Sequence, residues 1–436
     1  MKSWIRGGFA CALALLAVPA VLTAQQQENP TLKGGISETG LRRVVIAVPL
    51  FSAPADSGAR ALALEVTRTL RNDLEASGYF SVVPPKHYRL IPASAAGAEP
   101  PFHEWQGVGA ESLVQGSVHL DGDRFRVEGK LFDPAGRQMI MGRRYRGTQD
   151  LGRQIAHRMA DEVVLHYTGR RGMAQSKIAF VARVGQAKEV YLMDYDGRQV
   201  RRLTANGSLN LSPAWSPDGE RIAITSYRNE LPALFLLDKQ GNLKKIRLPN
   251  SALNISPDWS PDGETLAYSA SRRGNADIYL LNVDSLRTRR LTSHRAIECC
   301  ASWSPTGREL AFTSDRGGSP QIYVMDAEGA NVRRLTYQGS RNDSAAWSPQ
   351  GEYIAYVSRV GGSFHVHRLD LATRKVTQLT FGRSNNESPS WSPDGRHLVF
   401  ASDRTGGYDI YRIPAGGGEP VRLTRTEGAS APAWSR

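Results

Sequence analysis

A repeat of about 44 residues constrains the fold of this chain more than any other feature. Each copy carries Trp-Ser-Pro-x-Gly, where x is Asp, Thr or Gln, and a shortened Trp-Ser copy stands at residues 434–435. The tryptophans, spaced by 44, 44, 44, 44 and 43 residues, are Trp215, Trp259, Trp303, Trp347, Trp391 and Trp434. A fixed period of this length is typical of solenoids and propellers, in which one small unit of structure is repeated.

Every unit reads as four short strands separated by tight turns. In the third unit the strands are predicted at 301–304, 309–314, 321–326 and 332–336. Pro305 and Gly307 predict the first turn, because proline presets its φ angle and glycine accepts a positive φ. Four strands in about 44 residues are typical of one β-propeller blade.

The two ends of the repeat region predict the number of blades. Five full units begin at Trp215. Residues 177–204 supply three strands of a unit that has no tryptophan strand, and residues 431–436 supply a tryptophan strand with no unit behind it. Together the fragments complete one blade, which predicts a six-bladed ring over 177–436. An open array is the alternative, but it would expose two sheet edges, and nothing like a cap follows Trp434.

The beginning of the chain differs in composition from the rest. Two basic residues precede a largely apolar run at 7–18, and small residues follow up to Ala24. This order is typical of a secretory signal peptide, and the run is too short for a stable membrane span. We therefore expect a signal peptide at 1–24, cleaved after Ala24 or, alternatively, after Ala20, and a flexible arm at 25–41.

Residues 42–169 predict a small α/β domain, which a linker at 170–176 joins to the propeller. Leu62, Val66 and Leu70 recur every four residues and predict one apolar face of a helix over 56–77. The other predicted elements are strands at 43–51, 80–83, 112–120, 124–133 and 138–147 and a helix at 151–167. The full chain is therefore expected to be mainly β, with a six-bladed propeller after a small α/β domain.

The formal net charge of +13 arises from 55 Lys and Arg against 42 Asp and Glu. Part of this excess recurs on the predicted outermost strands, at Arg202, Arg290, Arg334 and Arg422. Such a pattern indicates a solvated rim that protects sheet edges. Because no aromatic residues interleave with these arginines, and because we expect export, nucleic-acid binding is not predicted.

Sequence motifs that carry catalytic chemistry are absent. The chain has no Gly-x-Ser-x-Gly nucleophile elbow, no His-Glu-x-x-His, no phosphate-binding Gly-Lys-Ser/Thr loop and no dinucleotide fingerprint. Three Cys do not suffice for a four-thiolate metal site. The dipeptides Asp315-Arg316 and Asp403-Arg404 recur at one turn position and predict ion pairs that brace the turn. We predict no enzyme activity, no cofactor and no catalytic or metal site.

Polar residues stand five and three positions before the repeat tryptophans. The pairs are Asn210 and Ser212, Asn254 and Ser256, Glu298 and Cys300, Asn342 and Ser344, and Asn386 and Ser388, and the last copy has Ala429 and Ala431. Because these loops enter the innermost strands, their residues are expected to ring one mouth of the channel. Two interpretations stay open: the side chains cap the loop backbone, or they form a polar funnel that receives a peptide or an ion.

Cys299 and Cys300 fall within this ring. In an exported protein these adjacent thiols have three possible states: a strained disulfide with each other, a bond to another chain, or a reduced and buried pair. The third cysteine, Cys11, lies in the predicted signal peptide. An ordinary long-range disulfide within the mature chain is therefore excluded.

The predicted leader, α/β domain and six-bladed propeller with Trp-Ser-Pro-Asp-Gly turns together resemble the TolB family of the periplasmic Tol–Pal cell-envelope system. The resemblance covers residues 42–436 and includes the strand end at 48–51 and the closing segment at 431–435. It implies a periplasmic protein without catalytic activity. It also implies two partners, the lipoprotein Pal at the propeller mouth and the inner-membrane protein TolA at the mature N-terminal segment.

The same resemblance places the Pal contacts in the loops just before the repeat tryptophans. Carried over by position, these contacts are Leu253, Ser256, Cys299 and Cys300. Together with the polar ring, the predicted partner-binding residues are Leu253, Asn254, Ser256, Glu298, Cys299, Cys300, Asn342, Ser344, Asn386 and Ser388. The resemblance also suggests calcium in the channel, although the ring is short of the carboxylates that calcium prefers.

Our functional prediction is an adaptor that links a Pal-type lipoprotein to inner-membrane Tol proteins and supports outer-membrane integrity and cell division. The alternative is a propeller enzyme, or a sugar- or ion-binding module, acting in the central channel. Clustered carboxylates on the inner strands would favour that alternative, whereas the positions before the tryptophans are mainly Ala and Ser, with Asp258.

Overall fold

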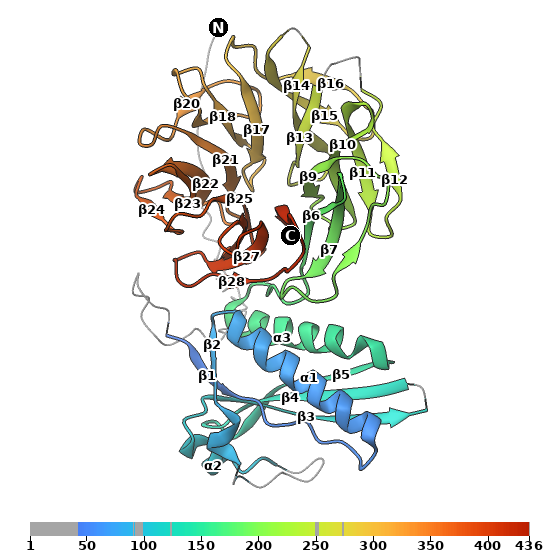
Figure 1. Ribbon diagram of the computed structural model, residues 1–436. Helices are drawn as coiled ribbons and strands as arrows, with labels where there is room; N and C mark the ends of the chain where they lie inside the picture. Colours follow the sequence, from blue (N-terminus) through green and yellow to red (C-terminus); the bar gives the residue numbers. More distant parts are fainter. Residues whose placement is uncertain are drawn as a thin grey trace, which may run out of the picture.

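The computed structural model describes residues 42–89, 91, 99–122, 124–248, 253–272 and 274–435. An N-terminal α/β domain lies beside a β-propeller (Figure 1). The predicted signal peptide and arm lie outside the described residues. Of the helices within the described ranges, none combines the length and the apolar character needed to cross a bilayer.

The N-terminal domain is a five-stranded sheet in the order β2-β1-β3-β4-β5. Strand β1 pairs in parallel with β2 and β3, and the remaining pairs are antiparallel. In chain order its elements are β1 (Val44–Ala47), α1 (Ser57–Ala76), β2 (Phe80–Val82), the 3₁₀ turn η1 (Pro85–Tyr88), α2 (Phe102–Gly107), β3 (Ser112–Asp121), β4 (Arg124–Asp133), β5 (Gln138–Thr148), the 3₁₀ turn η2 (Gln149–Leu151) and α3 (Gly152–Thr168).

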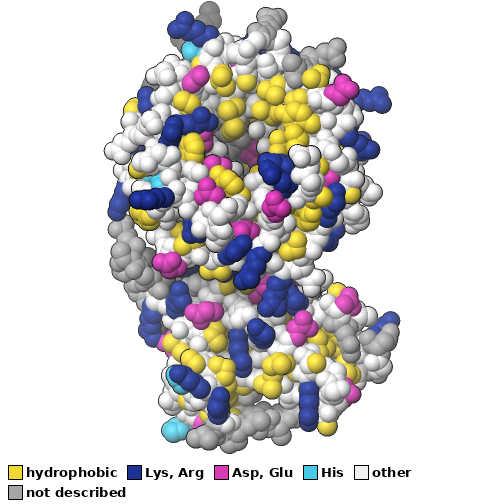
Figure 2. All heavy atoms as spheres, viewed as in Figure 1, with side chains coloured by type: hydrophobic (Ala, Val, Ile, Leu, Met, Phe, Trp, Pro, Cys, Tyr) yellow, Lys and Arg dark blue, Asp and Glu magenta, His cyan; other side chains and the backbone are white. Residues whose placement is uncertain are grey.

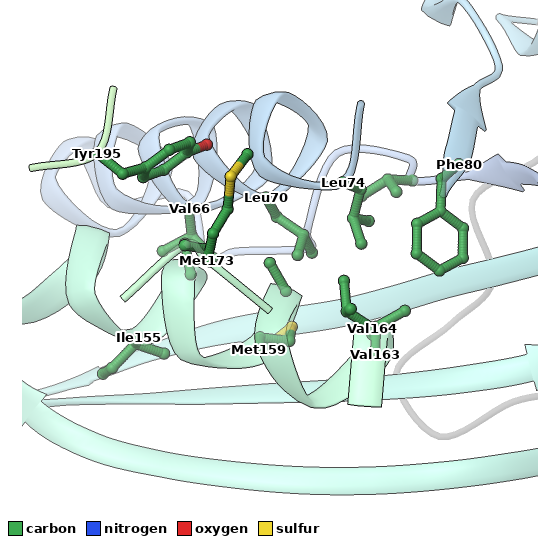
Figure 3. Close-up of a cluster of buried hydrophobic side chains, with 14 of the residues drawn as sticks. Val66, Leu70, Leu74, Phe80, Ile155, Met159, Val163, Val164, Met173 and Tyr195 are labelled. Atoms are coloured by element: carbon green, nitrogen blue, oxygen red, sulfur yellow. The ribbon is translucent and has the colours of Figure 1, made fainter. Parts of the chain in front are cut away.

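Helices α1 and α3 pack against each other on the side of the sheet that faces the propeller (Figures 1 and 3). Helix α1 begins after Asp56, whose carboxylate accepts the Ala59 amide, and its predicted apolar face is buried. Two predictions need correction. Strand β1 ends at Ala47 rather than at residue 51, since Pro49 has no amide for a ladder, and the short helix α2 was not predicted.

The propeller has six four-stranded sheets. We number the blades in chain order, with the blade that joins the two ends as blade 6. Blades 1 to 3 consist of β9 (Asn210–Trp215), β10 (Arg221–Asn229), β11 (Leu231–Asp238), β12 (Leu243–Lys245); β13 (Leu253–Trp259), β14 (Thr265–Ser271), β15 (Ala276–Asn282), β16 (Thr288–Arg290); β17 (Glu298–Trp303), β18 (Glu309–Ser314), β19 (Gln321–Asp326) and β20 (Arg333–Arg334). Blades 4 to 6 consist of β21 (Asn342–Trp347), β22 (Tyr353–Val360), β23 (Ser363–Asp370), β24 (Val376–Gln378); β25 (Asn386–Trp391), β26 (His397–Ser402), β27 (Asp409–Pro414), β28 (Val421–Arg422); and β29 (Ser430–Trp434), β6 (Lys177–Val184), β7 (Ala187–Asp194), β8 (Arg201–Arg202).

Blade 6 closes the ring by joining the last strand to the first three. Strand β29 pairs antiparallel with β6, with Trp434 opposite Ile178. The Lys177 amide donates to Ser435 Oγ at 2.9 Å, and Trp215 Nε1 of blade 1 donates to the Ala433 carbonyl at 3.1 Å. The predicted six-bladed closure is confirmed.

The two domains share one buried core (Figure 3). Met173, in the segment between them, and Tyr195, at the end of β7, pack with residues of α1 and α3. Asp161 on α3 accepts the Ala174 and Gln175 amides at 2.9 and 3.0 Å. The segment between the domains is therefore anchored to helix α3.

Candidate functional site

Each inner strand of the propeller carries a β-bulge just before its tryptophan. At the bulge the residue three positions before the tryptophan has a left-handed φ. These residues, the bulge ring, are Ser212 (49°), Ser256 (52°), Cys300 (57°), Ser344 (56°), Ser388 (54°) and Ala431 (46°). For residues other than glycine this conformation costs roughly 1–2 kcal/mol. Its repetition in all six blades indicates a built feature of the channel wall.

Neighbouring blades support the bulges. The Ser256 amide donates to Thr225 Oγ1 of the preceding blade at 3.1 Å, and the Cys300 amide donates to Ser269 Oγ at 3.2 Å. The bulge ring and the residues that follow it line a central cavity of about 260 Å³. Small bulge-ring side chains, four of them serines, therefore surround the channel, and contacts between blades support the bulges that carry Ser256 and Cys300.

The residues five positions before the tryptophans do not face the channel. We call them the clamp residues, and each is at most 6 % exposed: Asn210, Asn254, Glu298, Asn342 and Asn386. Asn210 Nδ2 donates to Glu189 Oε2 of the preceding blade at 3.0 Å, and Asn342 Nδ2 donates to Gln321 Oε1 at 2.7 Å. This placement supports the capping interpretation for the clamp residues, whereas the bulge ring remains open to the channel.

The recurring Asp-Arg turns hold the clamp residues and the backbone next to them. Asp315 Oδ1 accepts the Ile297 amide at 2.8 Å, just before the clamp residue of blade 3. Arg316 pairs with the buried carboxylate of Glu298, while Arg404 Nη2 donates to Asn386 Oδ1 at 2.8 Å. The predicted ion pair within each dipeptide is wrong. The aspartate accepts a backbone amide, and the arginine interacts with the side chain of the clamp residue.

We expect Glu298→Ala to lower the free energy of unfolding by about 2–3 kcal/mol. The Arg316 guanidinium, which lies 5.3 Å from the centre of the Tyr323 ring, would lose its buried carboxylate. Glu298→Asn should cost less than about 1 kcal/mol, because asparagine serves as the acceptor for Arg404 in blade 5. Urea denaturation followed by circular dichroism measures both values. Equal losses for Ala and Asn would contradict the clamp.

Next to the bulge ring, on its N-terminal side, each inner strand has one partly buried side chain at the mouth. These rim residues are Leu211, Ile255, Cys299, Asp343, Glu387 and Ser430. On blades 1 to 3 they are apolar or sulfur-containing, and the nearby Leu209 and Ile297 are 38 % and 54 % exposed. Figure 2 shows one opening of the channel as a hollow with hydrophobic side chains gathered along part of its edge.

The rim is acidic on blades 4 and 5. Asp343 accepts Arg341 Nε at 2.7 Å, and burial raises the pKa of Glu387, which accepts the Tyr408 hydroxyl at 3.1 Å. Of the rim residues, only Cys299 is among the partner-binding residues predicted from the sequence. The others lie between the two polar positions, and only a comparison of the same offset in all copies would have revealed them.

The N-terminal domain leaves this mouth open. The inner strands of blades 1 to 5 each run from the mouth to a Trp-Ser-Pro-x-Gly turn, so these turns lie at the opposite end of the channel. On that turn side Arg396, two residues after Asp394, donates to the Gly78 carbonyl of the N-terminal domain at 3.1 Å. A partner can therefore reach the rim without displacing the N-terminal domain.

The suggestion of calcium in the channel comes from the resemblance alone, and the chemistry of the channel lining bears on it. Within the described ranges, no three His, Cys, Asp or Glu side chains are grouped as metal ligands. The channel lining contains Asp258 and serine hydroxyls but is otherwise apolar or backbone. Calcium prefers six to eight oxygens with several carboxylates, so this donor set does not fit it.

Comparison with known proteins covers both parts of the chain. A family model described as "TolB beta propeller domain" matches residues 165–436, and one described as "TolB amino-terminal domain" matches residues 35–140. The crystal structure of TolB from Acinetobacter baumannii superposes with a TM-score of 0.76 at 30 % identity, covering 91 % of this chain and 97 % of that one.

Curated relatives carry the name "Tol-Pal system protein TolB". The protein of Ruegeria sp. (strain TM1040) is 33 % identical over 233 residues, which is 52 % of each chain. That of Geobacter sulfurreducens is 38 % identical over 219 residues, which is 49 % of each chain. The chain thus spans about half the length of the curated relatives it matches. Because the family model of the TolB propeller matches more than half of the residues of this chain, the chain belongs to the TolB family.

Proposed function

We propose that this chain is the non-catalytic periplasmic adaptor of a Tol–Pal system. In this role it binds a Pal-type lipoprotein at the propeller mouth and a TolA-type inner-membrane protein through its N-terminal region. It thereby supports outer-membrane integrity and cell division. Family membership supports participation in the system.

The observation that carries the proposed partner site is the ring of half-exposed rim residues around an open mouth. Its apolar sector on blades 1 to 3 faces an acidic sector on blades 4 and 5. A protein surface that presents apolar side chains next to a lysine or arginine would complement both sectors. The clamp residues hold the loops in shape before a partner arrives, which lowers the entropic cost of binding.

The N-terminal contact is carried by the resemblance alone, because residues 25–41 lie outside the described ranges. Periplasmic location likewise rests on the predicted signal peptide and on the family. Both parts of the proposal are tested by locating the protein in cell fractions and by deleting residues 25–41 in a TolA-binding assay. Loss of TolA binding with Pal binding retained is the expected result.

We expect Ile255→Lys and Ser256→Arg each to weaken binding of the soluble domain of the Pal-type lipoprotein at least about tenfold, or 1.4 kcal/mol. Lysine would place a charge in the apolar sector, and arginine would fill the channel entrance. Isothermal titration calorimetry measures the affinity. Glu264→Lys is the matched control, because this exposed residue lies at the turn end of the same blade. Unchanged affinity in both mouth variants would refute the proposed site.

A further inference from the structure

Blade 3 carries two sulfur atoms at the mouth of the channel. Cys299 is its rim residue and Cys300 belongs to the bulge ring. The two Sγ atoms lie 3.2 Å apart, and both residues are partly buried. At the same two positions the other five copies have no cysteine.

The bulge gives this dipeptide freedom to change its torsion angles. Cys299 pairs with Thr313 in the ladder, and the next pair joins Ser302 to Ala311, so Cys300 takes no part in the ladder register. Its φ of 57° and its amide contact to Ser269 Oγ belong to the bulge alone. Bringing the two sulfur atoms to a bonding distance of about 2.05 Å therefore need not break the strand pairing.

The electrostatic surroundings differ for the two thiols. The hydrogen bond with Cys299 lowers the pKa of Cys300, and the same contact raises the pKa of Cys299. Asp343 on blade 4 disfavours the thiolate at both positions, and its ion-pair partner Arg341 opposes this effect. Because the thiolate is the nucleophile in thiol–disulfide exchange, we assign the first attack to Cys300.

We propose that Cys299 and Cys300 are a redox site that forms a reversible disulfide by exchange with a small-molecule or protein disulfide. The Cys300 thiolate attacks one sulfur of the oxidant RS–SR, an S–S bond to Cys300 forms, and one thiolate RS⁻ leaves. The Cys299 thiolate then attacks Cys300 Sγ and expels the second RS⁻. Two electrons pass to the oxidant, and the two thiol protons end on the two released RSH molecules.

The geometry also explains why the bond is reversible. Adjacent Cα atoms are only about 3.8 Å apart, below the usual spacing of bridged cysteines, and such strain makes a disulfide easier to reduce. Oxidation draws a rim residue toward a bulge-ring residue and removes both S–H groups from the mouth. If the proposed function holds, this change alters the surface offered to the Pal-type partner.

The test is thiol counting in the chain that begins at Gln25, which lacks the predicted signal peptide and therefore Cys11. The purified protein is equilibrated with glutathione and glutathione disulfide, quenched with acid, alkylated and weighed by mass spectrometry. We expect two thiols or none per chain, with conversion over about a hundred-fold change in [GSSG]/[GSH]² and no dimers. Cys299→Ser and Cys300→Ser should each keep one reactive thiol. The control Cys299→Ile with Cys300→Ser copies blade 2 and should have none.

Three results would overturn the proposal: two thiols that persist at every ratio, disulfide-linked dimers, or a stable glutathione adduct on the unsubstituted chain. A second readout separates it from the proposed function. Oxidised and reduced protein are compared for binding to the soluble Pal-type domain, with a severalfold difference in affinity expected. Equal affinity refutes the link between the redox site and partner binding. No binding in either state refutes the proposed function but does not contradict the redox site.

Discussion

Replacing Trp434 by alanine is expected to lower the free energy of unfolding by about 3–5 kcal/mol. The side chain is 4 % exposed and belongs to the core shared by both domains. Its Nε1 donates to Ser176 Oγ at 2.7 Å, and its amide donates to Ser390 Oγ of blade 5 at 3.0 Å. Because β29 is the strand that closes the ring, loosening it exposes the edge of β6 as well as the cavity.

Trp347→Ala is the matched control for this prediction. Trp347 occupies the same repeat position but is half-exposed, and its Nε1 donates to the Gly351 carbonyl within its own turn. We expect a loss of about 2 kcal/mol or less, because its blade is formed by one continuous segment. Urea denaturation followed by far-UV circular dichroism measures both variants. A loss at Trp347 as large as that at Trp434 would contradict a special role of the closing strand.

Asp73→Ala is expected to cost about 3–5 kcal/mol through a buried charge network between the domains. Asp73 on α1 accepts His157 Nδ1 of α3 at 2.7 Å and the Tyr195 hydroxyl of the propeller at 2.6 Å. It is 3 % exposed. Removing it would leave a cation and a hydroxyl buried without their acceptor. Asn72→Ala, at the exposed neighbouring position of α1, is the control and should stay within about 0.5 kcal/mol of the original chain.

The same network predicts a dependence of stability on pH. Burial disfavours the charged form of His157, but hydrogen bonds with Asp194 and Asp73 outweigh it and raise the pKa of His157 to about 9, with Arg153 opposing. Because the unfolded pKa is about 6.5, the stabilisation is complete below that pH and is lost as the pH rises through 9. The loss between pH 6 and 10 should reach about 3 kcal/mol in the original chain. A pH dependence that is equally steep in Asp73→Ala would contradict this assignment.

The architecture could be predicted because it is a local property repeated along the chain. Each unit of about 44 residues contains its own turns and strand periods, so the blade number follows from counting. The same reasoning located the first helix, whose apolar residues contact one another at i and i+4. It overestimated β1, since a run of apolar residues does not show where strand pairing stops.

The candidate site could be predicted only as a set of loops. The sequence placed the residues before each tryptophan at the channel mouth, but of the two polar positions only the bulge ring lines the channel, whereas the clamp residues are buried. It could not separate the buried clamp residue Asn254 from the half-exposed Ile255 and Ser256, because a bulge reverses the alternation expected for a regular strand.

By itself, the sequence determined the repeat, the six blades and the closure by the last strand, because each unit contains its own turn residues and strand pattern. Only the tertiary structure decided which polar side chains hydrogen-bond between blades and which line the channel. It also brought Asp73, His157 and Tyr195 together from three distant segments. Contacts of this kind depend on how domains and blades pack, and no local pattern encodes them.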